Sequence, residues 1–149
     1  MIAVVQRVRE ASVYIDNELY SNIGEGLLIL LGVAKGDNED NSAFLARKIT
    51  DLRIFPDEND KMNLNVRDIY GEIMVISQFT LCSDKNKSGN RPSFTMAEMP
   101  ETANRLYEHL ISEMKNYYDK NKIKSGVFAG KMDIKLTNNG PVTIIMEKT

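Results

Sequence analysis

The stretch "LLILLGVAKGDNEDNSAFLARKITDL", residues 27–52, changes its hydrophobic period halfway along and thereby indicates the class of fold. Residues 27–33 are almost continuously apolar, which is typical of a strand buried on both faces. This run falls short of the roughly 20 residues that a membrane-spanning helix needs. Further on, Leu45, Ile49 and Leu52 recur at the spacing of an amphipathic helix. Three residues could cap this helix: Asp37, Asn38 and Asn41.

Periodicity predicts further strands on both sides of this strand and helix. Before them lie "IAVVQRVR", "SVYID" and "ELYSNI", with a tight turn expected at Asp16-Asn17. After them, "GEIMVISQFTL" predicts a strand, "KNKSGNRPSF" a long loop, and "SGVFAGKMDIKLTNNGPVTIIME" two or three strands. A second helix should follow Pro100, with an apolar strip made of Ala103, Leu106, Tyr107, Leu110, Ile111, Met114 and Tyr117. Residues 1–149 are therefore expected to form one mixed α/β domain.

Composition argues against several classes of chemistry. The chain has 19 basic and 21 acidic residues, so a nucleic-acid partner would have to meet a local basic patch. Cys82 is the lone cysteine, and His109 lies off the apolar strip, where a solvated helix residue is expected. These two residues cannot supply a Ser-His-Asp triad or a zinc site, and no cofactor is expected. The acidic stretches "GDNEDN" and "PDENDK" are predicted to be solvated loops. No apolar leader opens the sequence, so the cytoplasm is the expected compartment and no membrane partner is expected.

Two stretches hold unusual arrangements of polar groups. In "NNGPVT", residues 138–143, the local sequence favours a hairpin turn, but a cis Gly140-Pro141 peptide could instead present its carbonyl oxygens to a ligand. In "SQFTL", residues 77–81, polar groups end an apolar strand. Their hydroxyls, amide and backbone N–H groups either satisfy the neighbouring backbone or bind a substrate carbonyl, as an oxyanion site requires.

These two stretches together resemble the D-aminoacyl-tRNA deacylase family. Further matching segments are "QRV" at 6, "LLGV" at 30, "LARKI" at 45, "LRIF" at 52, "KMNL" at 61 and "GNRPSF" at 89. The resemblance implies an α/β fold, a three-layer β/β/α single domain with mixed sheets and two main helices. It also implies a homodimer with its active sites at the subunit interface. The implied reaction is hydrolysis of the ester between a D-amino acid and tRNA, or of glycyl-tRNA mischarged on tRNA(Ala).

The resemblance also implies roles for particular residues. Ser77, Gln78, Phe79 and Thr80 would form the catalytic pocket that receives the aminoacyl carbonyl. A cis Gly140-Pro141 peptide would enter the partner's pocket, hold the substrate's α-amino group with its carbonyl oxygens and reject L residues. Arg7 is either a brace for those carbonyls or a surface arginine. Because Thr80 has no evident base, the 2′-hydroxyl of the terminal ribose is expected to assist the attack.

Some features weaken or compete with this interpretation. Phe128 and Met132 would pack against the terminal adenine, although both could equally belong to the core. The chain has Asn139 where the family commonly has an acidic residue, and Ala129-Gly130 where the family usually has Gly then Ala. One alternative is a non-catalytic nucleic-acid-binding module using Lys120, Lys122, Lys124, Lys131 and Lys135. Another is a dimeric scaffold without chemistry.

Overall fold

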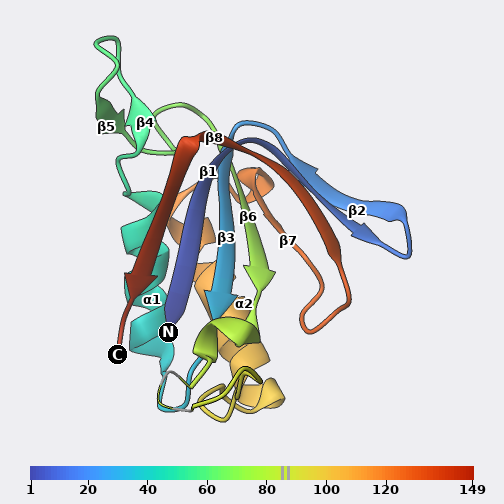
Figure 1. Ribbon diagram of the computed structural model, residues 1–149. Coiled ribbons are helices and arrows are strands. Elements are labelled where there is room, and N and C mark those ends of the chain that lie inside the picture. The colour runs from blue at the N-terminus through green and yellow to red at the C-terminus, as the bar shows by residue number, and fades with distance from the viewer. Residues whose placement is uncertain (85, 87) are drawn as a thin grey trace.

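The computed structural model describes residues 1–84, 86 and 88–149 and has a three-layer mixed α/β fold. Helices α1 (Glu39–Thr50) and α2 (Pro100–Tyr117) cover one face of a sheet, as Figure 1 shows. That sheet contains β1 (Ile2–Ile15), β2 (Glu18–Ile23), β3 (Gly26–Gly32), β6 (Glu72–Ser77), β7 (Ile123–Ser125) and β8 (Asp133–Glu147). The remaining elements are the hairpin of β4 (Phe55–Pro56) and β5 (Met62–Leu64), and two 3-10 helices, η1 (Phe79–Cys82) and η2 (Lys120–Lys122). Among the residues that the structure describes, no helix is long and apolar enough to cross a membrane.

Strand β1 belongs to two layers because it bends in the middle. Along one edge it pairs with β8, while its other edge pairs first with β3, through residues 2–8, and then with β2, through residues 11–15. Its pairing with β8 shifts register between Gln6 and Val8 and again between Val8 and Glu10. Such irregularities increase bending and twist, so the far half of β1 leaves the central sheet together with β2 and part of β8 (Figure 1).

Two hydrophobic clusters hold the three layers together. The larger lies between the helices and the sheet and includes Leu27, Ile73 and Leu110. The smaller lies on the other side of the sheet and consists of Val8, Ala11, Val13, Ile23, Leu28, Met74 and Ile76. Strands β3 and β6 therefore contact a core on both faces, which explains their continuous apolar runs. Each fully buried aliphatic side chain contributes about 1.5–3 kcal/mol to folding.

Two polar residues that the sequence places in solvent are in fact bonded inside the protein. Asn38 is the residue that caps α1, whereas Asp37 accepts hydrogen bonds from the amino-terminal ammonium group and from Ala34 N. His109 is half-buried, and its Nδ1 forms a hydrogen bond with the hydroxyl of Ser42 at 2.6 Å, which links α2 to α1. The prediction of solvation was wrong for both residues, because tertiary partners replace water.

The strands also differ from those predicted. Residues 2–15 form one continuous strand instead of two, and the Asp16-Asn17 turn is confirmed by positive φ angles of 50° and 66°. The two halves of β8, before and after "NNGPVT", both pair with β1 and not with each other, so the hairpin interpretation was wrong. The Gly140–Pro141 peptide bond is cis. Strand β6 ends at Ser77, before the turn of η1. The predicted loop over 85–94 has no helix or strand in its described residues; Lys85 and Lys87 lie outside them.

Candidate functional site

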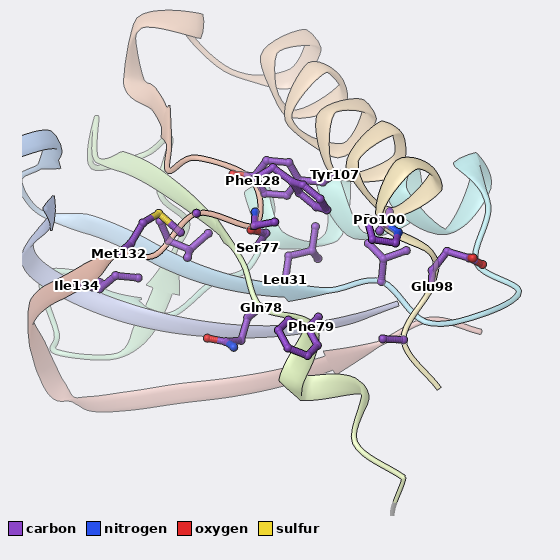
Figure 2. A pocket seen from close by; sticks show the side chains of 16 residues that line it. Leu31, Ser77, Gln78, Phe79, Glu98, Pro100, Tyr107, Phe128, Met132 and Ile134 are labelled. Carbon is purple, nitrogen blue, oxygen red and sulfur yellow. The ribbon is translucent and has the colours of Figure 1, made fainter. Parts of the chain in front are cut away.

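A cavity of about 430 Å³ opens where β3 and β6 end. Its other walls come from the beginning of α2 and from residues 126–132, which connect β7 to β8. Figure 2 shows the side chains of Phe128 and Tyr107 next to each other on one side, with Gln78 and Phe79 at the opposite rim. The remaining lining residues are Leu31, Val33, Ile76, Ser77, Ala97, Glu98, Pro100, Ala103, Ala129, Gly130, Met132 and Ile134. The cavity is predominantly apolar with a few polar groups, as is common for small-molecule sites.

The polar end of β6 contributes three of the predicted residues to this cavity. Ser77, Gln78 and Phe79 line it, and the backbone N–H of Gln78 donates to the carbonyl of Leu31 at 2.7 Å. Thr80 is exposed in η1 and does not line the cavity, but its hydroxyl accepts a hydrogen bond from Gln78 Nε2 at 2.5 Å. The first N–H groups of η1 have no partner within the helix and can serve as donors at the rim.

The segment before β8 contributes Phe128 and Met132. Gly130 N donates to the carbonyl of Val127 at 3.0 Å, which closes a tight turn, and Ala129 inside this turn has a φ of 55°. The N–H of Ala129 donates to the Ser77 hydroxyl at 3.3 Å, so this turn is attached to the end of β6. Phe128 is half-buried and packs against the larger core, so it is both a core contact and a cavity wall.

Tyr107 is a cavity residue that the sequence assigned only to the apolar strip of α2. It is 4% exposed, and its hydroxyl donates to the carbonyl of Val75 at 2.8 Å. Burial raises the pKa of Tyr107, which keeps the hydroxyl protonated as a donor. The signal that could have identified it is a tyrosine among aliphatic positions, because a buried phenol needs a polar partner.

Gly140–Pro141 does not reach the cavity of its own chain. It lies level with Arg7 on β1, since Gln6 is paired with Thr143 and Val8 with Asn138. Arg7 is paired with Leu27 on β3, and Leu27 is paired with Ile73 on β6, which lies four residues before Ser77. The separation is therefore roughly 13 Å along the strands and three strand spacings, about 14 Å, across them.

Arg7 is buried beside the Gly140–Pro141 peptide, which contradicts the surface-arginine alternative. It is 9% exposed, and its Nε donates to the carbonyl of Asn139 at 2.9 Å. Its Nη1 donates to the carbonyl of Ile54 at 2.6 Å, at the base of the β4–β5 hairpin. The guanidinium thus joins β8 to that hairpin, and the two-donor fork suits this geometry.

The cavity supplies polar contacts and shape more than acid–base groups. Among its lining residues, Glu98 carries the one carboxylate, and its Oε1 accepts the N–H of Met99 at 2.7 Å beside the start of α2. Within the described ranges 1–84, 86 and 88–149, the lining contains no histidine, lysine or cysteine. This arrangement can orient a ligand between apolar walls and offer an amide, hydroxyls and backbone donors to a carbonyl group.

Comparisons with known proteins agree with one another along the whole chain. The family model described as D-Tyr-tRNA(Tyr) deacylase matches residues 4–147. The D-aminoacyl-tRNA deacylase of Persephonella marina is 50% identical over 147 residues, which cover 99% of this chain and 97% of that protein. The corresponding enzyme of Dictyoglomus turgidum is 48% identical, with 99% and 92% covered.

Two solved structures have the same fold. The structure of a c-Myc DNA unwinding element binding protein is 39% identical, with a TM-score of 0.94, and the alignment covers 100% of this chain and 99% of that one. A probable eukaryotic D-amino acid tRNA deacylase has a TM-score of 0.82 at 11% identity, with 97% of each chain covered. Because its sequence identity is only 11%, this second structure indicates a shared fold and nothing further.

Proposed function

The chain belongs to the D-Tyr-tRNA(Tyr) deacylase family of ester hydrolases, and we propose that it cleaves D-aminoacyl-tRNA and glycyl-tRNA mischarged on tRNA(Ala) while it rejects L-aminoacyl esters. The observation that carries this proposal is the cavity at the end of β6, lined by Ser77, Gln78 and Phe79. Its volume of about 430 Å³ suits a small part of a large substrate, such as an aminoacylated nucleoside. Because this substrate belongs to translation, the cytoplasm is the proposed compartment.

Each group around the cavity has a proposed task. Gln78 and the backbone donors at the start of η1 orient the scissile carbonyl, whose oxygen gains negative charge during attack. Phe128 and Met132 contact the terminal adenine, since a flat base packs well against an aromatic ring and a thioether. The 2′-hydroxyl beside the ester assists the attack, in line with a cavity whose described lining residues include no histidine or lysine.

The chirality filter comes from a second copy of the chain. Gly140–Pro141 lies too far from its own cavity, so its carbonyl oxygens reach a substrate only in a partner's cavity. A sheet face is available for pairing: Ile145, Val4 and Leu30 are in register across β8, β1 and β3, on the side away from the helices. Ile145 is 67% exposed, an unusual position for a large aliphatic side chain, and burial in a homodimer would remove it from water.

Incubation with D-tyrosyl-tRNA, L-tyrosyl-tRNA and glycyl-tRNA tests the activity. Release of D-tyrosine and glycine with the L ester intact is the expected result. Equal hydrolysis of the D and L esters would contradict the chirality filter, and stability of all three esters would contradict the deacylase.

A mixing experiment tests the composite site. A Gly140→Ala chain and a Gln78→Ala chain, each impaired alone, should regain activity when subunits exchange. In each dimer of the two variants, one of the two sites then combines an unaltered Gln78 with an unaltered Gly140 from the other subunit. Full activity of a monomer at high dilution would contradict this arrangement. Salt should weaken substrate binding, because cationic side chains that meet phosphates release counterions.

A non-catalytic nucleic-acid-binding module is the second candidate. The observation in its favour is the set Lys120, Lys122, Lys124, Lys131 and Lys135, which lies on η2, on β7 and around the beginning of β8. The 39% identical neighbour is also described as a DNA unwinding element binding protein. Binding of tRNA without loss of the ester would favour this module, and the same deacylation assay therefore separates the two candidates.

A further inference from the structure

Two tyrosines of the α2 region donate their hydroxyls to carbonyl oxygens on the same side of the sheet. The Tyr107 hydroxyl donates to the carbonyl of Val75, within β6, at 2.8 Å. The Tyr118 hydroxyl donates to the carbonyl of Gly71, just before β6, at 2.6 Å. Burial raises the pKa of both phenols, so both remain donors. Only Tyr107 of the two lines the cavity.

Tyr107 contacts the segment 126–132 at two separate points. Its hydroxyl shares the carbonyl of Val75 with the N–H of Gly126, which donates to the same oxygen at 3.1 Å. Its ring lies against the ring of Phe128, with centroids 5.7 Å apart and planes tilted by 51°. One side chain therefore fixes both the beginning of the segment and the aromatic group that the segment presents to the cavity (Figure 2).

The other bonds that hold this segment are weak or local. Val127 N donates to the thioether of Met132 at 3.4 Å, and Ala129 N donates to the Ser77 hydroxyl at 3.3 Å. A sulfur is a weak acceptor, and both contacts are long. None of these bonds touches the Phe128 ring, whose orientation thus depends on packing against the larger core, in which Tyr107 supplies the aromatic contact.

We propose that Tyr107 is a positioning residue that presets the Phe128 ring and thereby sets the affinity for the terminal adenosine of the tRNA. The inference rests on the proposed function, because it takes the adenine to lie against Phe128. A ring held in place before binding loses less conformational entropy when the base packs on it. This contact is the same in the ground state and in the transition state, so it acts on KM and leaves kcat unchanged.

The test compares Tyr107→Phe with Tyr118→Phe, which removes a matching hydroxyl bond from the same strand region away from the cavity. Both variants should lose similar amounts of thermal stability. Tyr107→Phe alone should raise KM for D-tyrosyl-tRNA about 3- to 10-fold, the effect of one lost hydrogen bond, with kcat within about twofold. The affinity for the RNA trinucleotide 5′-CCA-3′, measured by calorimetry, should fall by the same factor. Tyr107→Leu, which also removes the ring contact, should cost about 10-fold or more.

The possible failures can be told apart. Unchanged KM and unchanged trinucleotide affinity in Tyr107→Phe would overturn the positioning role while the deacylase stands. A fall in kcat with constant KM would overturn it too, because the residue would then act on the reacting groups. If the wild-type protein hydrolyses D esters but does not bind the trinucleotide, the adenosine contact and this inference both fail. Should the leucine variant not fold, the phenylalanine variant alone decides.

Discussion

Arg7 Nε donates a hydrogen bond to the carbonyl oxygen of Asn139 at 2.9 Å, at the residue directly before Gly140–Pro141. Because Arg7 is buried and also bonds the carbonyl of Ile54, two backbone acceptors depend on one side chain. Lysine carries its charge at a single point and cannot reproduce the fork. We expect Arg7→Lys to lower the free energy of unfolding by about 1–3 kcal/mol, measured by chemical denaturation. Arg9→Lys on the exposed side of the same strand is the control; equal losses in both variants would contradict this role.

Gly140 occupies a site where a side chain meets neighbours on two sides. A Cβ atom there would lie 2.8 Å from Val142 Cγ2 and 2.9 Å from Arg7 Nη2, and the residue has a φ of 135°. The matched control is Gly36, whose φ of 89° is also positive but which has no atom within 4 Å of a built Cβ. We expect Gly140→Ala to destabilise the fold by about 1–3 kcal/mol more than Gly36→Ala, because only the former is overpacked.

The same pair of variants addresses activity. Gly140→Ala should impair hydrolysis of D esters or allow hydrolysis of L esters, because displacement of Val142 and Arg7 turns the neighbouring carbonyls, whereas Gly36→Ala should change neither rate. Unaltered rates on D, L and glycyl esters in Gly140→Ala would remove Gly140 from the proposed filter.

Ala129 occupies a conformation that favours glycine. Its φ of 55° lies in the left-handed region, where an L side chain costs about 1–2 kcal/mol. We expect Ala129→Gly to stabilise the protein by up to about 1 kcal/mol after the greater flexibility of glycine in the unfolded chain is subtracted. Ala43→Gly, within α1, should instead destabilise the protein, because glycine is unfavourable inside a helix. A stability loss in both variants would show that no strain exists at Ala129.

The periodic parts of the chain could be predicted from sequence. The apolar strip of α2 is buried at every predicted position except Tyr117 at the end of the helix, and residues 27–32 of the continuous apolar run 27–33 lie within β3. In contrast, Asn139, Gly140 and Pro141 carry a local turn signal, and the register with β1 passes over them, from Asn138 opposite Val8 to Thr143 opposite Gln6. The parts of β8 on either side both pair with β1, and Val142 is buried, so tertiary pairing decides against the hairpin that local preference favours.

The candidate site was only partly accessible from sequence. The resemblance placed Ser77, Gln78 and Phe79 together, and all three line the cavity. Tyr107 was not predicted as a site residue, because helical periodicity places cavity residues and core residues on the same face of α2. The distance between Gly140–Pro141 and the cavity follows from strand register, which only pairing in three dimensions defines.

Asp57 gives the β4–β5 hairpin an acid-sensitive stability. Its carboxylate accepts hydrogen bonds from Asn63 Nδ2 at 2.6 Å, Lys61 N at 3.0 Å and Asn59 N at 2.8 Å, and these bonds lower its pKa, the Asn63 side chain most. Because the pKa of Asp57 is lowered by folding, its carboxylate stabilises the folded state at pH values above the ordinary aspartate pKa. This stabilisation is lost as the pH falls through the pKa of the folded state. Asp57→Asn should therefore melt at a lower temperature than the wild type at about pH 7, and the difference should shrink as the pH falls below the ordinary aspartate value of 3.8.

Asp60→Asn removes an equal charge from the same hairpin and is the control for Asp57→Asn. Its φ of 60° suits asparagine as well as aspartate, so no backbone penalty is added. A melting gap for Asp57→Asn that is constant with pH, or one that Asp60→Asn reproduces, would contradict the hydrogen-bonded carboxylate as its cause.

Thr80 is the hydroxyl most easily mistaken for a nucleophile. It is exposed, and its Oγ1 accepts a hydrogen bond from Gln78 Nε2, an arrangement that holds the amide in place but offers no base to remove the hydroxyl proton. The substrate itself carries a 2′-hydroxyl next to the ester.

We therefore expect Thr80→Ala to retain measurable hydrolysis of D-tyrosyl-tRNA, with a moderate loss because Gln78 becomes less ordered. A substrate that ends in 2′-deoxyadenosine should be cleaved roughly 100-fold or more slowly by the unaltered protein, which is the size of general acid–base assistance. Its affinity, measured by competition with normal substrate, should fall by no more than about 10-fold, the upper effect of one lost hydrogen bond. Thr80→Val, which keeps the branched shape, separates packing from the hydroxyl. Normal turnover of the deoxy substrate together with an inactive Thr80→Val variant would reverse the assignment and make Thr80 the attacking group.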